Sequence, residues 1–270
     1  MSEKSARIAA SHRLLRRVRR TESGEFLVEG VQAVAEAVGY EADNPGCVLE
    51  LYITESAAGR QPTVVRRAFG AGIEVTQVTD RAAALLSDTQ APQGIFARCR
   101  MIDVSVQTAL AGSPKLVVVL IETNDPGNAG TIIRLADAVG ADAVIVAGDA
   151  VDPFNPKVVR ATTGSLFHLP IARADDPAAL LEVLAAAGLS TMATTGSAEL
   201  DLDVAGRDGL LELPTAWLFG SEAHGLPAEI IAAADAAVRV PIHGRAESLN
   251  LATAAAVCLY ASASVQRRQQ

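Results

Sequence analysis

Cysteine, histidine and aromatic residues are scarce in this chain of 270 residues, which has three cysteines, four histidines and 4% aromatics. Cys47, Cys99 and Cys258 lie far apart and form no CxxC pair. This pattern predicts unpaired thiols in a reducing cytosol and excludes a disulfide framework. The scattered histidines and the missing CxxC pairs also argue against a zinc site, so we expect no metal.

Long apolar runs are also missing. No run approaches the roughly 20 residues that a membrane-spanning helix needs, and the basic N-terminus lacks the apolar stretch of a secretion signal. We therefore expect a cytoplasmic protein with no membrane partner. Hydrophobic residues nevertheless make up 50% of the chain, which is ample for one large domain or two ordinary ones.

Acidic residues exceed basic ones, and the formal net charge is −8. Residues 1–105 contain 13 basic and 13 acidic residues, whereas residues 106–270 contain 10 and 18 and carry the whole excess. The first 20 residues hold seven basic side chains and one acidic one, so residues 1–23 form a basic N-terminal arm. An acidic protein with one basic arm suits a local phosphate contact better than RNA wrapped over its whole surface.

The basic arm allows two interpretations. Leu14, Leu15 and Val18 fall at helical spacing and predict a basic amphipathic helix. The alternative is a solvated, partly frayed terminus. In the functional interpretation the arm contacts RNA phosphates through five arginines: Arg13, Arg16, Arg17, Arg19 and Arg20.

Strand and helix patterns alternate in residues 24–105. The predicted strands and helices, in chain order, are strand 26–28, helix 31–38, strand 48–53, helix 61–69, strand 73–78, helix 81–86 and strand 94–99. Gly39 and Gly70 are expected to end the first two helices. This range is long enough to fold alone. Residues 106–114, with their Gly-Ser-Pro sequence, are predicted to be a linker.

Residues 115–270 are predicted to be a second α/β domain. The run 115–121 is continuously apolar, which is typical of a strand buried on both faces. A helix over 132–139, capped by Gly140, and a strand at 143–147 complete a parallel crossover unit. Further helices are expected at 156–163 and 177–187, and further strands at 189–194, 216–219 and 237–242. The predicted fold class is therefore a parallel sheet covered by helices, preceded by a small α/β domain.

Three polar loops follow buried strands of the second domain, where α/β proteins usually bind ligands. The first, residues 123–130, resembles a phosphate-cradling turn at a helix start. It matches neither GxGxxG nor a nucleotide-triphosphate loop. Arg134 lies about one helical turn beyond Gly130, so its guanidinium can hold a phosphate or carboxylate in bidentate fashion. The alternative is a surface ion pair with Asp137.

The second and third loops carry Glu222, Ser248 and Asn250. Each has a structural alternative, because Glu222 and Ser248 can cap the helices that follow and Asn250 can bond to backbone. Together they put carboxylate, hydroxyl and amide groups at the ends of buried strands, which favours a shared pocket. His224 and His243 lie in the same loops without a partner at ligand spacing, and no catalytic triad is recognisable.

These three loops resemble the three motifs of the SpoU family of RNA ribose 2′-O-methyltransferases, in the SPOUT superfamily. The matching stretches are DPGNAGTIIRLADAVGAD, LFGSEAHGLP and VPIHGRAESLNLATAAAVCLY, and together they span essentially all of residues 115–262. Three motifs in order and at the right spacing are much more specific than any one of them. FLVEGVQAVAEAV and APQGIFARC resemble pieces of the RNA substrate-binding domain that many members carry before the catalytic domain.

The resemblance implies a trefoil knot in the last third of the catalytic domain, against the general rule that chains avoid knots. It also implies that S-adenosylmethionine binds in that knot, largely to the backbone of the second and third loops. By position the cofactor-binding residues are Thr195, Gly196, Leu218, Gly220, Val240, Ile242 and Leu249. Members of the family are homodimers, and the apolar segment 254–260 is the expected interface.

The resemblance also implies roles for five residues, which are Arg134, Asn128, Glu222, Ser248 and Asn250. Arg134 matches the arginine proposed to activate the ribose hydroxyl. Because arginine stays protonated, we expect it to orient a phosphate and stabilise the developing alkoxide, and the proton acceptor stays open. Ala252 stands where members often have serine, which puts fine positioning in doubt.

The expected substrate is ribosomal RNA, most of all 23S RNA, because members with the added N-terminal domain mostly act there. The nucleotide, and whether its modification confers antibiotic resistance, stay open. One alternative is the same activity on transfer RNA. Another is a non-catalytic ribosome- or RNA-binding protein that retains the knot, for which Ala252 is the support. A nicotinamide-dependent oxidoreductase is remote, because the dinucleotide fingerprint is missing.

Overall fold

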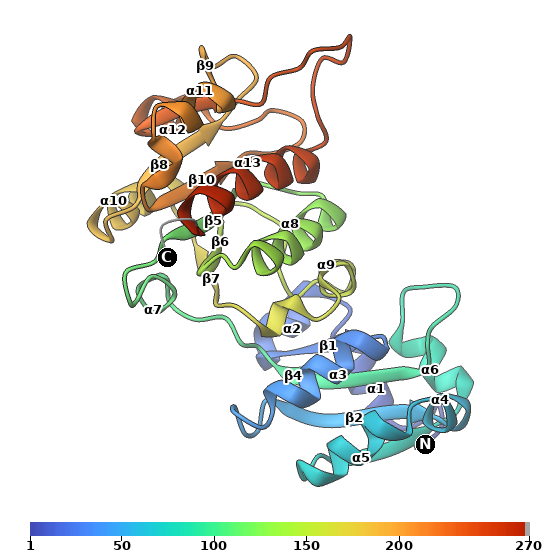
Figure 1. The fold of residues 1–270 in the computed structure, drawn as a ribbon. Helices are drawn as coiled ribbons and strands as arrows, with labels where there is room; N and C mark the ends of the chain where they lie inside the picture. Colours follow the sequence, from blue (N-terminus) through green and yellow to red (C-terminus); the bar gives the residue numbers. More distant parts are fainter. Residues whose placement is uncertain (268–270) are drawn as a thin grey trace. The chain divides into compact units, whose positions relative to one another are not determined.

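The structure, a computed structural model, describes residues 1–267. The chain divides into two compact units (Figure 1). The first comprises Met1–Ile102 and Asp152–His168, and the second comprises Asp103–Val151 and Leu169–Gln270. The segment Asp152–His168 therefore belongs to the first unit, although in the sequence it lies among the strands and helices of the second. The backbone passes between the units three times.

The first unit is built on a four-stranded sheet in the order β1-β4-β2-β3. Its strands are β1 (Glu25–Glu29), β2 (Val48–Thr54), β3 (Val75–Val78) and β4 (Ile95–Arg100). β4 runs antiparallel to both β1 and β2, and β3 runs parallel to β2. The helices of residues 1–102 are α1 (Ala6–Arg13), α2 (Arg17–Ser23), α3 (Val31–Tyr40), α4 (Glu55–Arg60), α5 (Pro62–Gly70) and α6 (Asp80–Leu86).

The N-terminal arm is folded onto this sheet, as the helical interpretation predicts. The Ser5 hydroxyl accepts from the Arg7 N–H and caps α1. Ile8 and Leu14 are buried in a core cluster of the unit. Burial of this apolar stripe leaves Arg13, Arg16 and Arg17 at the surface.

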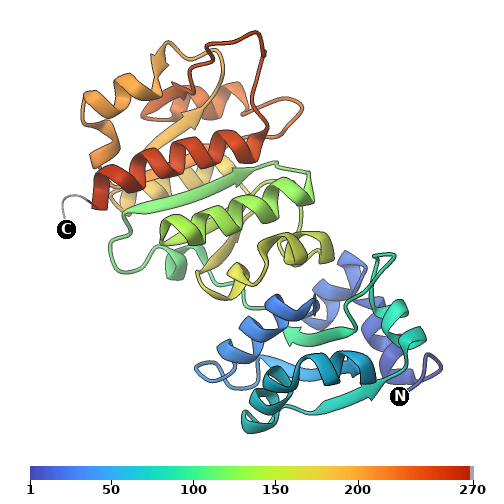
Figure 2. The same ribbon diagram turned by 45° about the vertical axis from the view of Figure 1, so that its right-hand side comes forward.

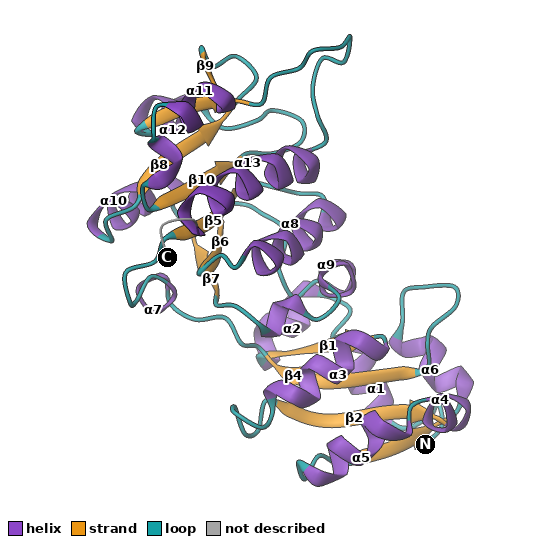
Figure 3. Cartoon of the chain, in the orientation of Figure 1, coloured by secondary structure: helices purple, strands orange, loops and turns teal. Residues whose placement is uncertain are grey.

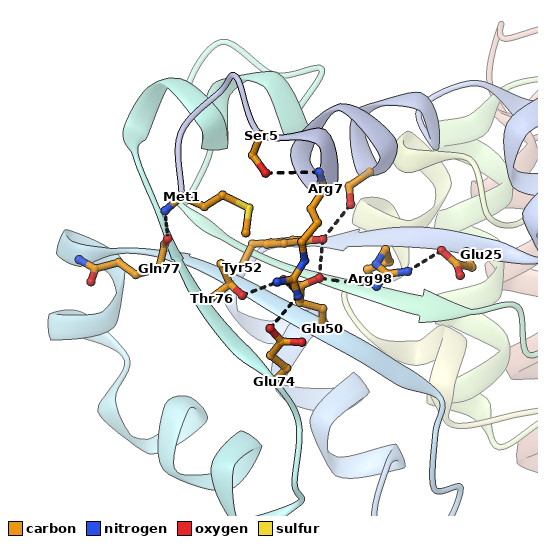
Figure 4. A network of polar contacts seen from close by, with 11 residues as sticks. Met1, Ser5, Arg7, Glu25, Glu50, Tyr52, Glu74, Thr76, Gln77 and Arg98 are labelled. Atoms are coloured by element: carbon orange, nitrogen blue, oxygen red, sulfur yellow. Dashed lines mark hydrogen bonds and ion pairs between the residues drawn. The ribbon is translucent and has the colours of Figure 1, made fainter.

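A buried carboxylate anchors α1 to the sheet. Glu50 of β2 is fully buried and accepts from the hydroxyls of Tyr52 (2.8 Å) and Thr76 (2.7 Å) (Figure 4). Arg7 of α1 contacts the same carboxylate at 2.7 Å, and Arg98 of β4 lies 3.5 Å from it. A buried charge is tolerated only when it is paired and hydrogen-bonded, so these contacts hold the helix and three strands in one arrangement.

The segment Asp152–His168 completes the core of the first unit. It forms α9 (Pro156–Thr162) and the 3-10 turn η1 (Ser165–Phe167). Phe154 packs on Phe26 of β1, with ring centroids 4.7 Å apart. Asp152 accepts from the Arg20 guanidinium of α2 at 2.7 and 2.9 Å, and both side chains are almost fully buried.

Without the Asp152 carboxylate, the first unit should be less stable. We expect Asp152→Ala to lower the free energy of unfolding by about 3–5 kcal/mol, because the Arg20 charge then stays buried without its partner. Urea unfolding followed by circular dichroism measures this. Asp149→Ala, at an exposed carboxylate slightly earlier in the chain, is the matched control. Equal stability of the two variants contradicts the assignment.

The second unit is built on a seven-stranded sheet in the order β7-β6-β5-β10-β8-β11-β9, and every neighbouring pair is parallel. This confirms the predicted parallel sheet. The strands are β5 (Leu116–Ile121), β6 (Ala143–Ala147), β7 (Ile171–Ala174), β8 (Ser190–Thr194), β9 (Leu200–Asp201), β10 (Thr215–Phe219) and β11 (Ala236–Arg239). The helices and turns are α7 (Val106–Ala109), α8 (Pro126–Val139), α10 (Pro177–Ala186), α11 (Leu202–Arg207), η2 (Leu210–Glu212), α12 (Ala228–Ala233) and α13 (Leu251–Gln266).

Helices cover both faces of this sheet (Figure 2). α8 and α13 pack together on one face, where Trp217 of β10 donates to the Ser262 hydroxyl of α13 at 2.9 Å. α10 and α12 contribute to the core cluster of the other face. Ala109 and Leu110, inside the expected linker, are buried in that same cluster. The connection 106–114 is thus partly a core element of the second unit.

Several elements differ from the sequence patterns (Figure 3). α3 continues through Gly39 to Tyr40. β11 ends at Arg239, short of the expected end at residue 242, because Pro241 has no N–H to donate to a ladder. The short elements α4, α11, β7 and β9 were not predicted. Within residues 1–267 no helix is both long enough and apolar enough to cross a membrane.

Candidate active site

A cavity of about 420 Å³ lies at the carboxyl ends of β8, β10 and β11. These strands are neighbours in a parallel sheet, so their carboxyl ends meet at one edge. The walls come from three loops, which are residues 194–196, 221–225 and 240–250, and from the start of α13. The loop 123–125 after β5 reaches the same edge and touches the second of them.

Five of the seven residues expected to bind cofactor line this cavity: Thr195, Gly196, Val240, Ile242 and Leu249. Leu218 does not, because its side chain is fully buried in the core of the sheet, and its carbonyl accepts from the Thr194 hydroxyl at 2.8 Å. The sequence patterns also missed Thr194 and Val238, which line the wall from β8 and β11. Their position at a strand end was the available signal.

Gly220 allows the second loop to pack closely against its own backbone. Ser221 and Gly225 exchange two backbone hydrogen bonds of 3.0 and 2.9 Å, which folds the loop back on itself. A Cβ atom on Gly220 would lie 2.2 Å from the Gly225 carbonyl carbon and 2.3 Å from the Leu226 nitrogen. Both of these are backbone atoms, so only glycine allows this close approach.

A methyl group at position 220 should therefore displace the loop that walls the cavity. We expect Gly220→Ala to weaken S-adenosylmethionine binding at least about tenfold, the effect of only 1.4 kcal/mol, with the rest of the fold intact. Isothermal titration calorimetry measures the affinity, and circular dichroism the fold. Gly59→Ala, on α4 with nothing within 4 Å of the added methyl and no positive φ, controls for loss of a glycine. Unchanged affinity in Gly220→Ala would exclude a role for this loop.

Three of the expected site residues are joined in one hydrogen-bonded chain. Asn250 Nδ2 donates to Asn128 Oδ1 at 3.0 Å, and Asn128 Nδ2 donates to Glu222 Oε1 at 3.0 Å. The other Glu222 oxygen accepts from the Asn124 N–H at 3.3 Å. The structure thus brings the three polar loops together through their side chains, and we call this chain the amide relay.

Both ends of the amide relay set its direction. Asn250 is the N-cap of α13, and its Oδ1 accepts from the N–H groups of Ala252 (2.9 Å) and Thr253 (3.3 Å). Its Nδ2 must then face Asn128. At the other end a carboxylate can only accept. The positive end of α13 is therefore connected to the Glu222 carboxylate through oriented amide dipoles.

Of the purely structural roles expected for Asn250, Glu222 and Ser248, the structure shows only that of Asn250. Asn250 does bond to backbone in the first turn of the helix, in addition to its contact with Asn128. Glu222 does not cap α12, whose N-cap is Pro227. Ser248 is not the N-cap of α13 and lies in the cavity wall instead.

Arg134 lies on α8, outside the residues that line the cavity. The helix is well defined, because the Asp125 side chain caps its start and Gly140 ends it in the left-handed conformation. Arg134 is exposed and forms no ion pair with another described residue, so the expected alternative, a pair with Asp137, is not found. Its guanidinium is free to meet an anion from solution.

No cysteine is among the described residues that line the cavity. Cys258 of α13 is free, and burial raises its pKa to about 12, so the nucleophilic thiolate is not populated at neutral pH. Among residues 1–267 no cluster of three metal-ligating side chains is found. The groups at the cavity include an amide, hydroxyls and the carboxylates of Glu222 and Glu247, which suit binding and orientation.

Residues 115–260 match the SpoU rRNA methylase family, and residues 6–97 match the MRM3-like substrate binding domain. The chain is 32% identical to the 23S rRNA (guanosine(2553)-2′-O)-methyltransferase RlmP of Bacillus subtilis, over 96% of each chain. It is 34% identical to the 23S rRNA (uridine(2479)-2′-O)-methyltransferase of Streptomyces viridochromogenes, over 90% of this chain and 84% of the relative.

Solved structures agree with these similarities. The SpoU methyltransferase AviRb of Streptomyces viridochromogenes, in complex with AdoMet, superposes with a TM-score of 0.82 at 30% identity. That match covers 98% of this chain and 100% of AviRb. An AdoMet-bound rRNA methyltransferase of Sinorhizobium meliloti gives a TM-score of 0.83 at 29% identity, over 100% of this chain and 98% of the other.

Proposed function

The chain belongs to the SpoU rRNA methylase family, and we propose that it is an S-adenosylmethionine-dependent ribose 2′-O-methyltransferase of 23S ribosomal RNA. The observation that carries the proposal is the amide relay beside the cavity, because it joins side chains from all three family motifs. The relatives named above act on 23S rRNA according to their names, which favours that RNA over transfer RNA.

The residues around the cavity fit the cofactor. Val240, Ile242 and Leu249 offer apolar walls for an adenosine ring, and Thr194 and Thr195 offer hydroxyls at the rim. When bound, S-adenosylmethionine supplies a methyl group on a positively charged sulfur. The chain itself then has to hold the ribose oxygen in line with that methyl and exclude competing water.

In our proposal Arg134 and the amide relay have separate roles. Arg134 holds a backbone phosphate of the RNA and stabilises negative charge on the ribose oxygen. The relay holds Glu222 in one orientation at the cavity wall. Ser248 offers a hydroxyl at the same wall, which can bond to the ribose or a phosphate.

Methyl transfer to purified RNA tests the proposal directly. The full chain is incubated with methyl-labelled S-adenosylmethionine and, separately, 23S rRNA, 16S rRNA and transfer RNA, and the labelled ribose is mapped. We expect label in 23S rRNA. Label only in transfer RNA would move the activity to that substrate. No label, and no cofactor uptake by calorimetry, would favour the non-catalytic RNA-binding protein that Ala252 suggested.

We also propose a homodimer, a trefoil knot in the last third of the chain, and action in the cytoplasm. The exposed face of α13 supports the dimer, because the large apolar side chains of Val257 and Tyr260 are 40% and 53% exposed there. Sedimentation equilibrium of the full chain measures the oligomeric state. A monomer at micromolar concentration would exclude this interface.

The exposed arginines of α1 and α2 would supply RNA affinity through phosphates. Arg13, Arg16 and Arg17 are exposed, whereas Arg20 is buried against Asp152 and is left out of the proposed contact set. Arg19 already pairs with Glu22 at 2.6 Å.

Neutralising the three free arginines should weaken RNA binding and flatten its salt dependence. For Arg13→Gln/Arg16→Gln/Arg17→Gln we expect the slope of log K against log salt to fall by about 2, since each phosphate contact contributes about 0.7 on single strands. Filter binding at four salt concentrations measures the slope. The control triple Arg60→Gln/Arg66→Gln/Arg81→Gln removes equal charge from exposed positions of the same unit. Equal slopes for the two triples argue against a specific role of the arm.

A further inference from the structure

A second cavity, of about 510 Å³, lies in the first unit at the start of α3. Its walls are residues 29–33, part of the loop 89–93, and Arg160 and Thr163 at the end of α9. We call it the α3 cavity. Nothing in the proposed methyl transfer uses it, and all its walls belong to the unit that matches the substrate binding domain.

The charged side chains of the α3 cavity are paired within the protein. Arg160 contacts Glu29 at 3.1 Å and Asp88 at 2.6 Å. Glu29 also accepts from the hydroxyl of Ser87 at 2.7 Å. One guanidinium thus faces two carboxylates, so the cavity has no surplus positive charge for a phosphate. The walls therefore suit a polar ligand that carries no negative charge.

Hydrogen-bonding groups at the wall lack a partner in the described chain. The Thr163 hydroxyl is buried and has no partner in the described chain, and Thr163 is held at φ +52°, which is unusual for a β-branched residue. Gln93 Oε1 accepts from the Val31 N–H at 2.9 Å, and its NH₂ group has no partner among the described residues. The Gln32 side chain is exposed beside them.

We propose that the α3 cavity binds one unpaired nucleobase of the RNA substrate. This rests on the proposed function, since it takes RNA as the ligand. Sequence-specific proteins read RNA mainly at unpaired bases, through hydrogen bonds to the base edges. Side-chain amides such as those of Gln93 and Gln32 make paired contacts with a base edge. A cavity without surplus positive charge admits an uncharged base while the charged backbone stays outside.

Substitution of Gln93 by glutamate tests the base contact without removing the contact to Val31. Gln93→Glu keeps the acceptor oxygen and loses only the NH₂ donors, with one added negative charge. Gln90→Glu adds the same charge in the same loop outside the cavity. With a 23S rRNA transcript as probe, we expect Gln93→Glu to raise the Kd about tenfold relative to Gln90→Glu, in line with the loss of one base contact. The slope of log K against log salt should be the same in the two variants.

Thr163→Val gives a second test, in which stability and RNA affinity should change in opposite directions. A buried hydroxyl without a partner destabilises the free protein, so the near-isosteric valine should raise Tm by a few degrees. If a base completes that hydrogen bond, the same variant should bind the transcript several-fold more weakly. Higher Tm with unchanged RNA affinity, or equal Kd values for Gln93→Glu and Gln90→Glu, would overturn the proposal. Methylation by the wild-type chain separates the two proposals. If only the base-binding proposal fails, the wild-type chain still methylates the transcript, whereas failure of the proposed function leaves the transcript unmethylated.

Discussion

Arg134→Ala should lower kcat by about 100- to 1,000-fold, the usual cost of removing one donor that stabilises a developing negative charge. The guanidinium is exposed on α8 and is free of ion pairs with described residues, so its loss changes no packing. It also lies outside the cavity wall, so S-adenosylmethionine affinity should stay at the wild-type level. Single-turnover methylation and calorimetry measure the two quantities separately.

Two further variants control this result. Arg134→Lys keeps the positive charge but loses the planar fork that holds a phosphate through two bonds, so we expect an intermediate rate. Arg207→Ala removes an exposed arginine from α11 and should leave the rate unchanged. If Arg134→Ala methylates as fast as the wild type, the guanidinium has no part in the reaction.

Asn250→Asp should lower kcat by about 100-fold while the fold keeps its stability, since a misplacement near 1 Å at a reacting site has an effect of this size. Aspartate caps a helix as well as asparagine does, so α13 stays capped. The amide relay, however, loses its first donor. Asn128 then lies between two carboxylates, the new one and that of Glu222. Whichever way it turns its amide, one of these two contacts brings two oxygens face to face.

Helix capping and relay orientation can be separated by comparing variants at this position. Asn250→Ala loses both functions and should also lose about 0.5–2 kcal/mol of stability. Asn250→Ser keeps a capping hydroxyl, adds no charge and is too short to reach Asn128, so we expect wild-type Tm with reduced kcat. A wild-type kcat in Asn250→Asp would mean that the side chain serves only as a helix cap.

Local patterns were sufficient for most of the fold. The apolar run 115–121 and Gly140 mark the start and end of the β5-α8 unit, because burial and a left-handed glycine are decided within a few residues of the chain. Gly39 shows the limit of such rules, since α3 runs through it. The three polar loops could also be placed at strand ends, because parallel strands present their carboxyl ends at one edge.

Contacts between distant residues could not be deduced in this way. No local pattern shows that Arg20 meets Asp152, 132 residues away, or that Asp152–His168 completes the core of the first unit. The same holds for the order of donors from Asn250 through Asn128 to Glu222. Periodicity reports which side of an element is buried, whereas the partner of a polar group depends on how the whole chain packs. The sequence alone therefore determined the class of fold and the chemical groups at the cavity, and tertiary packing determined which of those groups face a ligand and which hold the protein together.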